Sequence, residues 1–537
     1  MPEAPRARIT GHARAEAVAR PAREPVPAGY GSSIADHELG ERRTAQDSLA
    51  RRLYPALHAA TLACSRLGLR GAGRRTGLVI ATSAADRHAV ARSPHAFLPP
   101  TADPAGQRSR RLDVLLAVSR FVSGGLAQDV AAMLGAGGPE LCLPGDCGLT
   151  PLAVAGLFVD SGRADAMVVV CVEPRADDPG RHEAVAVVIE RTTALGLAVP
   201  SQATDPAACV PAIEHYLAAG DGDGRTGAAR TSGPGCGDSR AGAVRGSGPG
   251  CGDSRAGAGR TPGAGCVVRW VAPAAPGPAD PEGFVDRGRR LLDESIRAAG
   301  SRDLGVVVAS LLDLSPEYAL AAIESGATTP EVAEAAGRMT FAGGLRRHHL
   351  DRGLRGPHLA VTGIPGASLL ALAIAEDLIN QGAVPAVAVI AGDWVGAGAA
   401  RALAVLDCPD QAYLRSSVSA LVLGPAGDQA GERRIRSLVA RRDACDAFRA
   451  ELGAHAPDVT IASGCTGEDL ATALAFIGRS SPPAGSAVPR AFRFLGADAL
   501  ACVAGALDLP GRAAVSARNA LGGSGVVLLD APRHGGA

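Results

Sequence analysis

The chain has 537 residues, which is enough for two or three ordinary domains. Its 54 basic and 54 acidic residues balance, so the composition gives no electrostatic reason to expect a nucleic acid or a membrane as partner. All the basic residues are arginine, which excludes Schiff-base chemistry on a lysine. Hydrophobic residues make up 47% and aromatic residues only 3%, which predicts a large core built from Ala, Val and Leu.

No run approaches the ~18 consecutive apolar residues of a membrane span, and the first twenty residues lack the apolar region of a secretory signal. The twelve cysteines are scattered among apolar runs, which predicts buried, reduced thiols in a cytoplasmic protein. Cys236 and Cys251 are one cysteine copied in a repeat, and neither has a second ligand at zinc-like spacing. We therefore expect no metal site.

Two segments have the composition of disordered chain. Residues 1–40 are rich in Pro, Arg, Ala and Gly and show no sustained period. Residues 201–270 form a Gly-rich linker in which residues 232–243 and 247–258 both read SGPGCGDSRAGA. We expect residues 217–265 to be dispensable, because they cannot bury enough apolar area to offset the entropy of ordering. Folded units are predicted over residues 41–200, 271–425 and 426–537.

Helical periodicity and continuous apolar runs alternate within each folded unit. The first unit is predicted to contain helices at 49–69, 112–134 and 150–161 and strands at 77–83, 140–143, 166–172 and 184–189. The same order returns in the second unit, with helices at 284–299 and 368–380 and strands at 305–310, 358–362, 386–391 and 419–423. The third unit is looser, with strands at 459–462 and 525–529 and helices at 470–477 and 497–507. This internal repeat is the strongest organisational signal in the sequence.

Strands that are apolar along their whole length predict an α/β fold whose sheets are covered by helices on both faces. We expect mostly parallel sheets in which residues 168–172 and 387–390 form central strands.

Two segments resemble the nucleophile-elbow segment of β-ketoacyl synthases. Residues 138–173 read GPELCLPGDCGLTPLAVAGLFVDSGRADAMVVVCVE, and residues 356–393 read GPHLAVTGIPGASLLALAIAEDLINQGAVPAVAVIAGD. Residues 515–529 (VSARNALGGSGVVLL) resemble the Gly-rich C-terminal loop and last strand of that family. The resemblance implies a thiolase-like layered αβαβα fold, in which the second and third units are the two halves of one synthase. The first unit is then an additional N-terminal thiolase-like half-domain.

Such synthases use a cysteine at the N-terminus of a buried helix, where the helix dipole favours the thiolate. Two histidines, or a histidine and an asparagine, assist decarboxylation and hold the oxyanion. The resemblance places the nucleophile position of the second unit on Pro365, which offers neither a nucleophile nor an N–H donor. It places the two histidine positions on Ser463 and Ala497, and the gating phenylalanine on Asn519. The resemblance therefore implies a degenerate catalytic set.

The first unit leaves two alternatives open. Counting forward from Gly138, the nucleophile position is Cys147; counting back from the following helix, it is Gly145, because this copy is two residues shorter. Cys147 precedes Gly148 and a helix, so the helix dipole could lower its pKa. We favour a partly buried structural thiol, since no histidine partner is visible in the sequence.

Residues 345–355 (LRRHHLDRGLR) form a cationic run that contains Arg346, Arg347, Arg352 and Arg355. The run could contact an acidic carrier protein or a phosphopantetheine phosphate. We favour the simpler interpretation of a solvated, partly ion-paired surface.

The resemblance implies a β-ketoacyl synthase homologue of polyketide or fatty-acyl chain assembly, of the chain-length-factor or polyketide ketosynthase type. We expect a non-catalytic partner of an active ketosynthase; the alternatives are an acyltransferase or condensing enzyme that uses Cys147, and a pure scaffold. No cofactor is expected to be permanently bound, although a phosphopantetheine-linked acyl group is a possible substrate. The expected partners are an acyl carrier protein, an active ketosynthase, or both.

Synthases of this family dimerise through their N-terminal halves, and this chain carries two such halves. We therefore expect the first unit to dock on the second as an internal pseudo-dimer, with a heterodimer with a separate synthase as the rival. Contact between residues 140–147 and residues 358–365 decides between the two. A linker of about 50 flexible residues spans roughly 35–40 Å, which permits the docking.

Overall fold

The computed structural model describes a large part of the chain, and the statements below concern that part. The described residues are 6–18, 54–69, 75–82, 130–131, 134–144, 148–175, 181–192, 197–200, 209–222, 266–276, 280–310, 314, 317–318, 320–321, 325, 340–362, 367–399, 416–426, 433–440, 459–463, 496–509, 511–518 and 524–530. None of the helices found there has the length and apolar character needed to cross a membrane.

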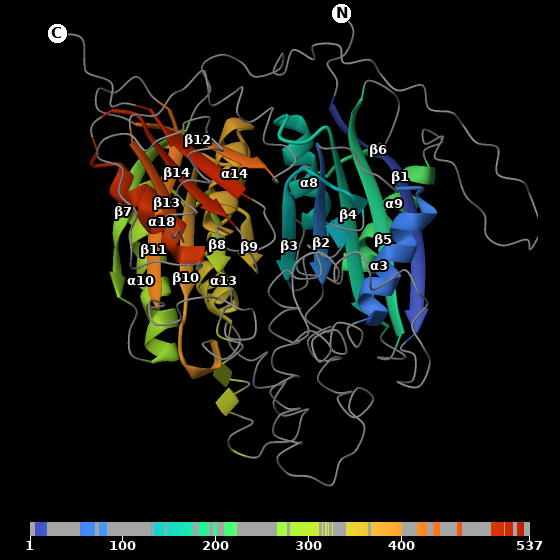
Figure 1. Ribbon diagram of the computed structural model, residues 1–537, viewed down its shortest axis with the longest axis horizontal. Coiled ribbons are helices and arrows are strands. Elements are labelled where there is room, and N and C mark those ends of the chain that lie inside the picture. The colour runs from blue at the N-terminus through green and yellow to red at the C-terminus, as the bar shows by residue number, and fades with distance from the viewer. Residues whose placement is uncertain are drawn as a thin grey trace, which may run out of the picture.

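Two mixed sheets with covering helices form the frame of the molecule (Figure 1). The six-stranded sheet belongs to the first unit and has the strand order β3-β2-β4-β5-β1-β6. Its strands β2, β3 and β4 are parallel, whereas β5, β1 and β6 follow in antiparallel pairs. The bounds are β1 Arg6–Val18, β2 Thr76–Thr82, β3 Glu140–Pro144, β4 Ala166–Pro174, β5 Arg181–Thr192 and β6 Leu197–Ala198.

The nine-stranded sheet combines the second and third units in the order β13-β14-β15-β12-β7-β11-β10-β8-β9. Strands β12 and β7 join the two units through a short antiparallel contact. The second unit supplies β7 Cys266–Pro276, β8 Leu304–Ser310, β9 His358–Thr362, β10 Ala386–Asp393 and β11 Ser417–Pro425. The third unit supplies β12 Arg434–Ala440, β13 Val459–Ser463, β14 Ala513–Arg518 and β15 Ser524–Leu529.

The internal repeat is visible in the strand order. The order β3-β2-β4-β5-β1 of the first unit returns in the second unit as β9-β8-β10-β11-β7. The third unit follows the same plan with one strand fewer among the described residues, in the order β13-β14-β15-β12. The chain is therefore built from three related half-domains.

Strands β4 and β10 lie inside their sheets, as their apolar sequences predicted. The expectation of mostly parallel sheets is wrong, because most strand pairings among the described residues are antiparallel. The apolar run of β4 predicts burial on both faces, and an antiparallel neighbour satisfies that condition as well as a parallel one does.

Helices cover both faces of the first sheet. Helix α3 (Tyr54–Arg66) packs on the face that carries Leu78 and Ile80. Helices α8 (Thr150–Asp160) and α9 (Cys209–Gly222) pack on the opposite face. Side chains alternate across the strands, so each face has its own apolar set and its own helices.

In the other two units, α10 (Pro281–Ala299) and α13 (Phe341–Asp351) pack on one face of the second unit's strands. Helices α14 (Ala367–Asn380) and α18 (Gly496–Ala506) lie between the strands of the second unit and those of the third. Residues 367–379 of α14 are all buried, as expected for a helix covered on every side. This arrangement gives the layers of the expected αβαβα fold.

Two compositional predictions need correction. Residues 1–40 were expected to be disordered, but Arg6–Val18 forms β1, which pairs with β5 along its whole length. Ala13 and Ala15 face inward, while Arg14 and Glu16 between and after them face outward. Because the inward side chains are small, the sequence shows no clear alternation of large apolar and polar residues. The expected linker 201–270 contains α9, whose residues Val210, Ile213 and Leu217 are buried on the first sheet. Residues 223–265, including the repeat, lie outside the described residues.

Candidate functional site

The start of the two elbow segments is fixed by a Gly-Pro pair. The carbonyl of Pro139 accepts a hydrogen bond from the N–H of Leu78 at 2.8 Å, and the carbonyl of Pro357 accepts the equivalent bond from Val306 at 2.8 Å. A Cβ at Gly356 would lie 2.3 Å from the carbonyl oxygen of Leu304. Glycine is needed here because the backbone of the neighbouring strand touches it.

The end of the two segments is fixed by a glycine turn. Gly162 and Gly382 both adopt left-handed conformations, with φ of +72° and +70°, and their N–H groups donate to Val159 and Ile379. The residues that follow them, Arg163 and Ala383, are therefore structurally equivalent. The same correspondence, carried back along the helices, aligns Pro365 with Gly145 rather than with Cys147.

The helix that follows the elbow differs between the copies. Carried back from the glycine turns, the first residue of α14 would correspond to position 147, whereas α8 begins only at Thr150. The N-cap of α8 is Leu149, which makes no side-chain capping hydrogen bond. Cys147 therefore precedes the N-cap by two residues instead of standing in the first turn. Cys147, Gly145 and Pro365 themselves lie outside the described residues.

The two predicted histidine positions lie on neighbouring elements of the third unit. Ser463 is the last residue of β13 and pairs with Ala517 in β14. Ala497 is the second residue of α18, which packs against both β13 and α14. The structure brings together the elements that carry these positions but does not describe the two side chains. Asn519 lies outside the described residues.

The cationic run forms α13 and the turn after it. The Arg352 guanidinium lies 2.7 Å from a carboxylate oxygen of Asp293, and that of Arg355 lies 2.9 Å from Asp303. Partial burial works against the charged form of Asp293, but hydrogen bonds from Arg352 and His348 hold the pKa of this carboxyl below its usual value. Two of the four candidate carrier contacts are therefore already paired within the chain. Arg347 is exposed and Arg346 is half-buried.

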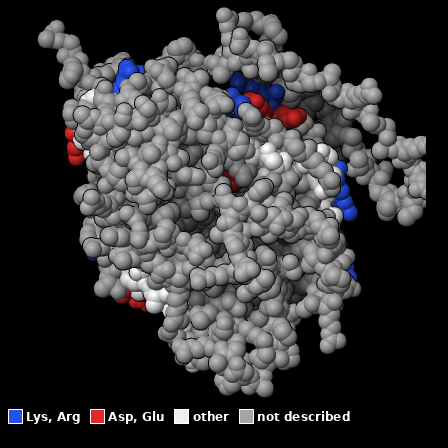
Figure 2. All heavy atoms as spheres, in the orientation of Figure 1, with Lys and Arg blue, Asp and Glu red and all other residues white. Residues whose placement is uncertain are grey.

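Charge on the visible face is also dispersed. Among the described residues drawn in Figure 2, arginines and carboxylates lie in small separate groups, and no large patch of one sign is visible. This distribution agrees with the balanced composition.

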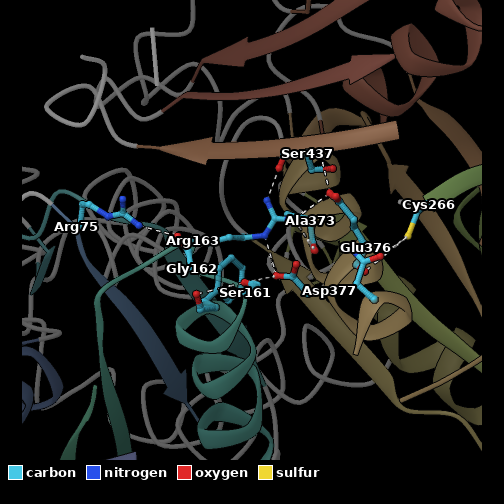
Figure 3. A network of polar contacts seen from close by, with 11 residues as sticks. Arg75, Ser161, Gly162, Arg163, Cys266, Ala373, Glu376, Asp377 and Ser437 are labelled. Carbon is cyan, nitrogen blue, oxygen red and sulfur yellow. Dashed lines mark hydrogen bonds and ion pairs between the residues drawn. The ribbon is translucent and has the colours of Figure 1, made fainter. Parts of the chain in front are cut away.

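The sequence did not predict the role of Arg163, a buried arginine at the contact between the three units. Figure 3 shows its side chain reaching from the turn after α8 to α14 and to Ser437. Its Nε lies 2.8 Å from Oδ2 of Asp377, and its Nη2 lies 2.9 Å from Oε2 of Glu376. Its Nη1 donates to the carbonyl of Ser437 in β12. One arginine of the first unit thus contacts both other units.

Further hydrogen bonds complete this arginine junction, defined as Ser161, Arg163, Glu376, Asp377 and Ser437. The Ser161 hydroxyl donates to Oδ2 of Asp377 at 3.0 Å, and the Ser437 N–H donates to Oε2 of Glu376 at 2.7 Å. The three charged side chains are only 5%, 3% and 1% exposed. Burial disfavours the charge of Arg163, but the two carboxylates outweigh it and raise its pKa further. The sequence held no signal for this pairing.

The predicted contact between the two elbow strands is confirmed. Strand β3 forms one edge of the first sheet and β9 one edge of the second, and the two edges lie side by side (Figure 1). Helices α8 and α14 also touch. The first unit therefore docks on the second within the chain, in the manner of a pseudo-dimer.

Residues of the first unit itself, Val199 and helix α9, pack near helix α8. A Cβ at Gly156 would lie 2.7 Å from a methyl group of Val199, just after β6. Helix α9 packs beside it, and the buried carboxylate of Glu173 accepts hydrogen bonds from the N–H groups of Cys209 and Val210 at its N-terminus. A carboxylate at this end offsets the helix dipole and fills two unsatisfied donors.

No protein-family model matches the sequence, and no curated protein matches it. Among solved structures, "PfaC Keto synthase-Chain length factor" matches with a TM-score of 0.54 and 11% identity, over 100% of this chain and 93% of that chain. Half-length matches include 3-oxoacyl-(acyl carrier protein) synthase III, FabH, from Pseudomonas aeruginosa PAO1, with a TM-score of 0.32 and 14% identity over 51% of this chain and 100% of that chain. That first match extends over the whole chain at a score above 0.5. The chain therefore has the thiolase-like α/β fold of a ketosynthase–chain length factor.

Proposed function

We propose that the chain is a non-catalytic, synthase-like subunit of polyketide or fatty-acyl chain assembly, which supports an active ketosynthase instead of condensing acyl units itself. The proposal is carried by this fold together with Pro365, Ser463 and Ala497, which the sequence resemblance assigns to the nucleophile and histidine positions. A proline at the elbow removes both the nucleophile and an N–H donor. The catalytic residues are missing at three separate positions, so a shift of the alignment at one position would not restore the set.

The late start of α8 argues against the alternative that Cys147 is the nucleophile. The effect of a helix dipole falls off within its first turn, and the cysteine lies before the N-cap. An acyl-binding role without turnover is compatible with the proposal, because a chain-length pocket requires shape and not a nucleophile.

Condensation of acyl and malonyl carrier thioesters by the purified full chain is the direct test. We expect no product above the background without protein, for the wild-type chain and for Cys147→Ala alike. Labelling of Cys147 by iodoacetamide should be no faster than that of an ordinary thiol. Product formation that disappears in Cys147→Ala overturns the proposal and makes the chain a condensing enzyme.

A carrier-protein titration separates a supporting subunit from a pure scaffold. We propose that an acyl carrier protein binds the cationic run through Arg346, Arg347, Arg352 and Arg355. Arg347 should contribute most, because it is exposed whereas Arg352 and Arg355 are already ion-paired within the chain. Arg347→Ala should then weaken carrier binding several-fold, whereas Arg297→Ala, at an exposed position of α10, should not. Equal effects of the two substitutions, or no binding to the wild-type chain, favour the scaffold.

A further inference from the structure

Two equivalent positions of the pseudo-dimer have opposite surroundings. Arg163 and Ala383 follow matching glycine turns, and both N–H groups bond to matching carbonyls, of Phe158 and of Leu378. The Arg163 side chain is 5% exposed in the arginine junction. Ala383 is exposed, as are its neighbours in the turn at residues 381–382. The pseudo-symmetry of the backbone is thus broken in the side chains.

The residues that pair with the arginine also differ between the two units. Glu376 and Asp377 lie six and five residues before Gly382, and the residues at the same distances before Gly162 are Gly156 and Leu157. The second unit therefore offers two buried carboxylates where the first unit offers a glycine and a leucine. The first unit offers the arginine where the second unit offers Ala383.

We infer that the arginine junction makes the pairing of the two half-domains directional: the docking surface around β9 and α14 fits the first unit of this chain and rejects a second copy of itself. Two second units facing each other would bury Glu376 and Asp377 opposite Ala383, with no cation in reach. Two first units would bury Arg163 opposite Leu157. A buried charge whose partner is removed is strongly destabilising, and only the unequal pair supplies that partner.

The third unit takes part in this selection. Arg163 donates to the Ser437 carbonyl, while Glu376 accepts from the Ser437 N–H. The carboxylate of Glu376 therefore bonds to β12 as well as to the arginine. On the opposite side of the pseudo-dimer the described residues show no such contact: α9 and Val199 pack on the first unit, and the turn at Ala383 is exposed. The docking surface for the first unit is therefore formed by the second and third units together.

Moving the arginine from one turn to the other tests the direction. The double variant Arg163→Ala/Ala383→Arg makes the second unit complementary to itself, so we expect its mass in sedimentation equilibrium to double relative to the wild-type chain. Ala383→Arg alone should keep the wild-type mass, because the first unit still occupies the surface. A double variant with wild-type mass, or a single Ala383→Arg variant that doubles, overturns the inference.

Hydrogen exchange supplies the second measurement. Arg163→Ala should raise the amide exchange rates of β3 and β9 at least tenfold, while β4 and β5 in the core of the first unit keep their protection. The matched control is Arg75→Ala, because Arg75 bonds only within the first unit among the described residues, to the Gly162 carbonyl at 2.7 Å and to Asp165 at 3.1 Å. Unchanged exchange at β3 and β9 in Arg163→Ala shows that the junction does not hold the units together.

Discussion

Nε of Arg163 lies 2.8 Å from Oδ2 of Asp377, although the two residues are 214 positions apart in the sequence. The other oxygen of Asp377, Oδ1, is buried and has no hydrogen-bond partner among the described residues. Burial raises the pKa of Asp377, and the interaction with Arg163 offsets that effect only in part. The pKa of the Asp377 carboxyl therefore stays above its ordinary value.

The raised pKa of Asp377 predicts a pH dependence of stability. The folded chain holds the Asp377 proton at pH values where the unfolded chain has lost it, so this group stabilises most below its ordinary pKa of about 3.9. That contribution is lost as the pH rises through the raised value. In Asp377→Asn the amide cannot titrate, so the difference in unfolding free energy between variant and wild type should change across this range. Urea unfolding of both proteins at a series of pH values measures it.

The control is Asp165→Asn, which removes an exposed carboxylate paired with Arg75 in the neighbouring turn. Its pH series measures the change that removal of a carboxylate outside the junction produces. A constant offset between Asp377→Asn and the wild type contradicts the prediction.

Two glycines of the second unit predict unequal responses to alanine. At Gly356 the new Cβ meets the backbone of β8, 2.3 Å from the Leu304 oxygen, and the backbone cannot yield as a side chain would. We expect Gly356→Ala to destabilise by about 3 kcal/mol. At Gly382 the Cβ meets open space and only the left-handed φ is unfavourable, which predicts about 1 kcal/mol. Urea unfolding midpoints rank the two variants, and equal losses would show that the contact at Gly356 relaxes.

Elements whose sequences contain long apolar runs could be predicted from the sequence. Strands β4 and β10 are covered on both faces and are apolar over most of their length. Helix α14 is buried over residues 367–379, and its buried residues are apolar apart from Ser368, Glu376 and Asp377. Strand β1 was missed because it is lined by alanine and arginine, and α9 was missed because its short apolar stripe lies next to Gly-rich sequence. The glycine turns could have been aligned from sequence, since the spacing of Gly162 and Gly382 to the following strands is the same.

The arginine junction could not have been predicted in this way. Arg163, Glu376 and Ser437 come from three units, and each residue taken alone has the sequence context of an ordinary surface group at a helix end or strand. Only the docking of β3 beside β9 brings them together. A single sequence carries the local pattern of each half-domain and not the pairing between them.

A second titrating site lies at the start of β9, on the docking edge. The ring of His358 lies 5.4 Å from the ring of His349, at an interplanar angle of 70°. Nε2 of His358 and Nδ1 of His349 are buried without a hydrogen-bond partner among the described residues, while Nε2 of His349 lies 3.1 Å from the Gly356 carbonyl. Burial lowers the pKa of both rings, and that of His358 falls to about 3, helped by the nearby His349 and Arg346. Both rings are therefore neutral at pH 7.

The lowered pKa of His358 predicts that acid loosens the docking edge. Between the ordinary histidine pKa of about 6.5 and the folded value of about 3, the unfolded chain binds the proton and the folded chain does not. The stability that depends on the neutral ring is therefore complete above about 6.5 and is lost as the pH falls toward 3, opposite in sign to the Asp377 effect. His358→Phe keeps a ring of similar size without a titrating nitrogen, so its unfolding free energy should fall less steeply with acid than that of the wild type. His215→Phe, at an exposed position of α9, is the control and should follow the wild-type curve. Amide exchange of β3 and β9 at pH 5 and pH 7 locates the change: faster exchange at pH 5 in the wild type but not in His358→Phe ties the acid effect to this edge, and equal curves for the wild type and His358→Phe refute it.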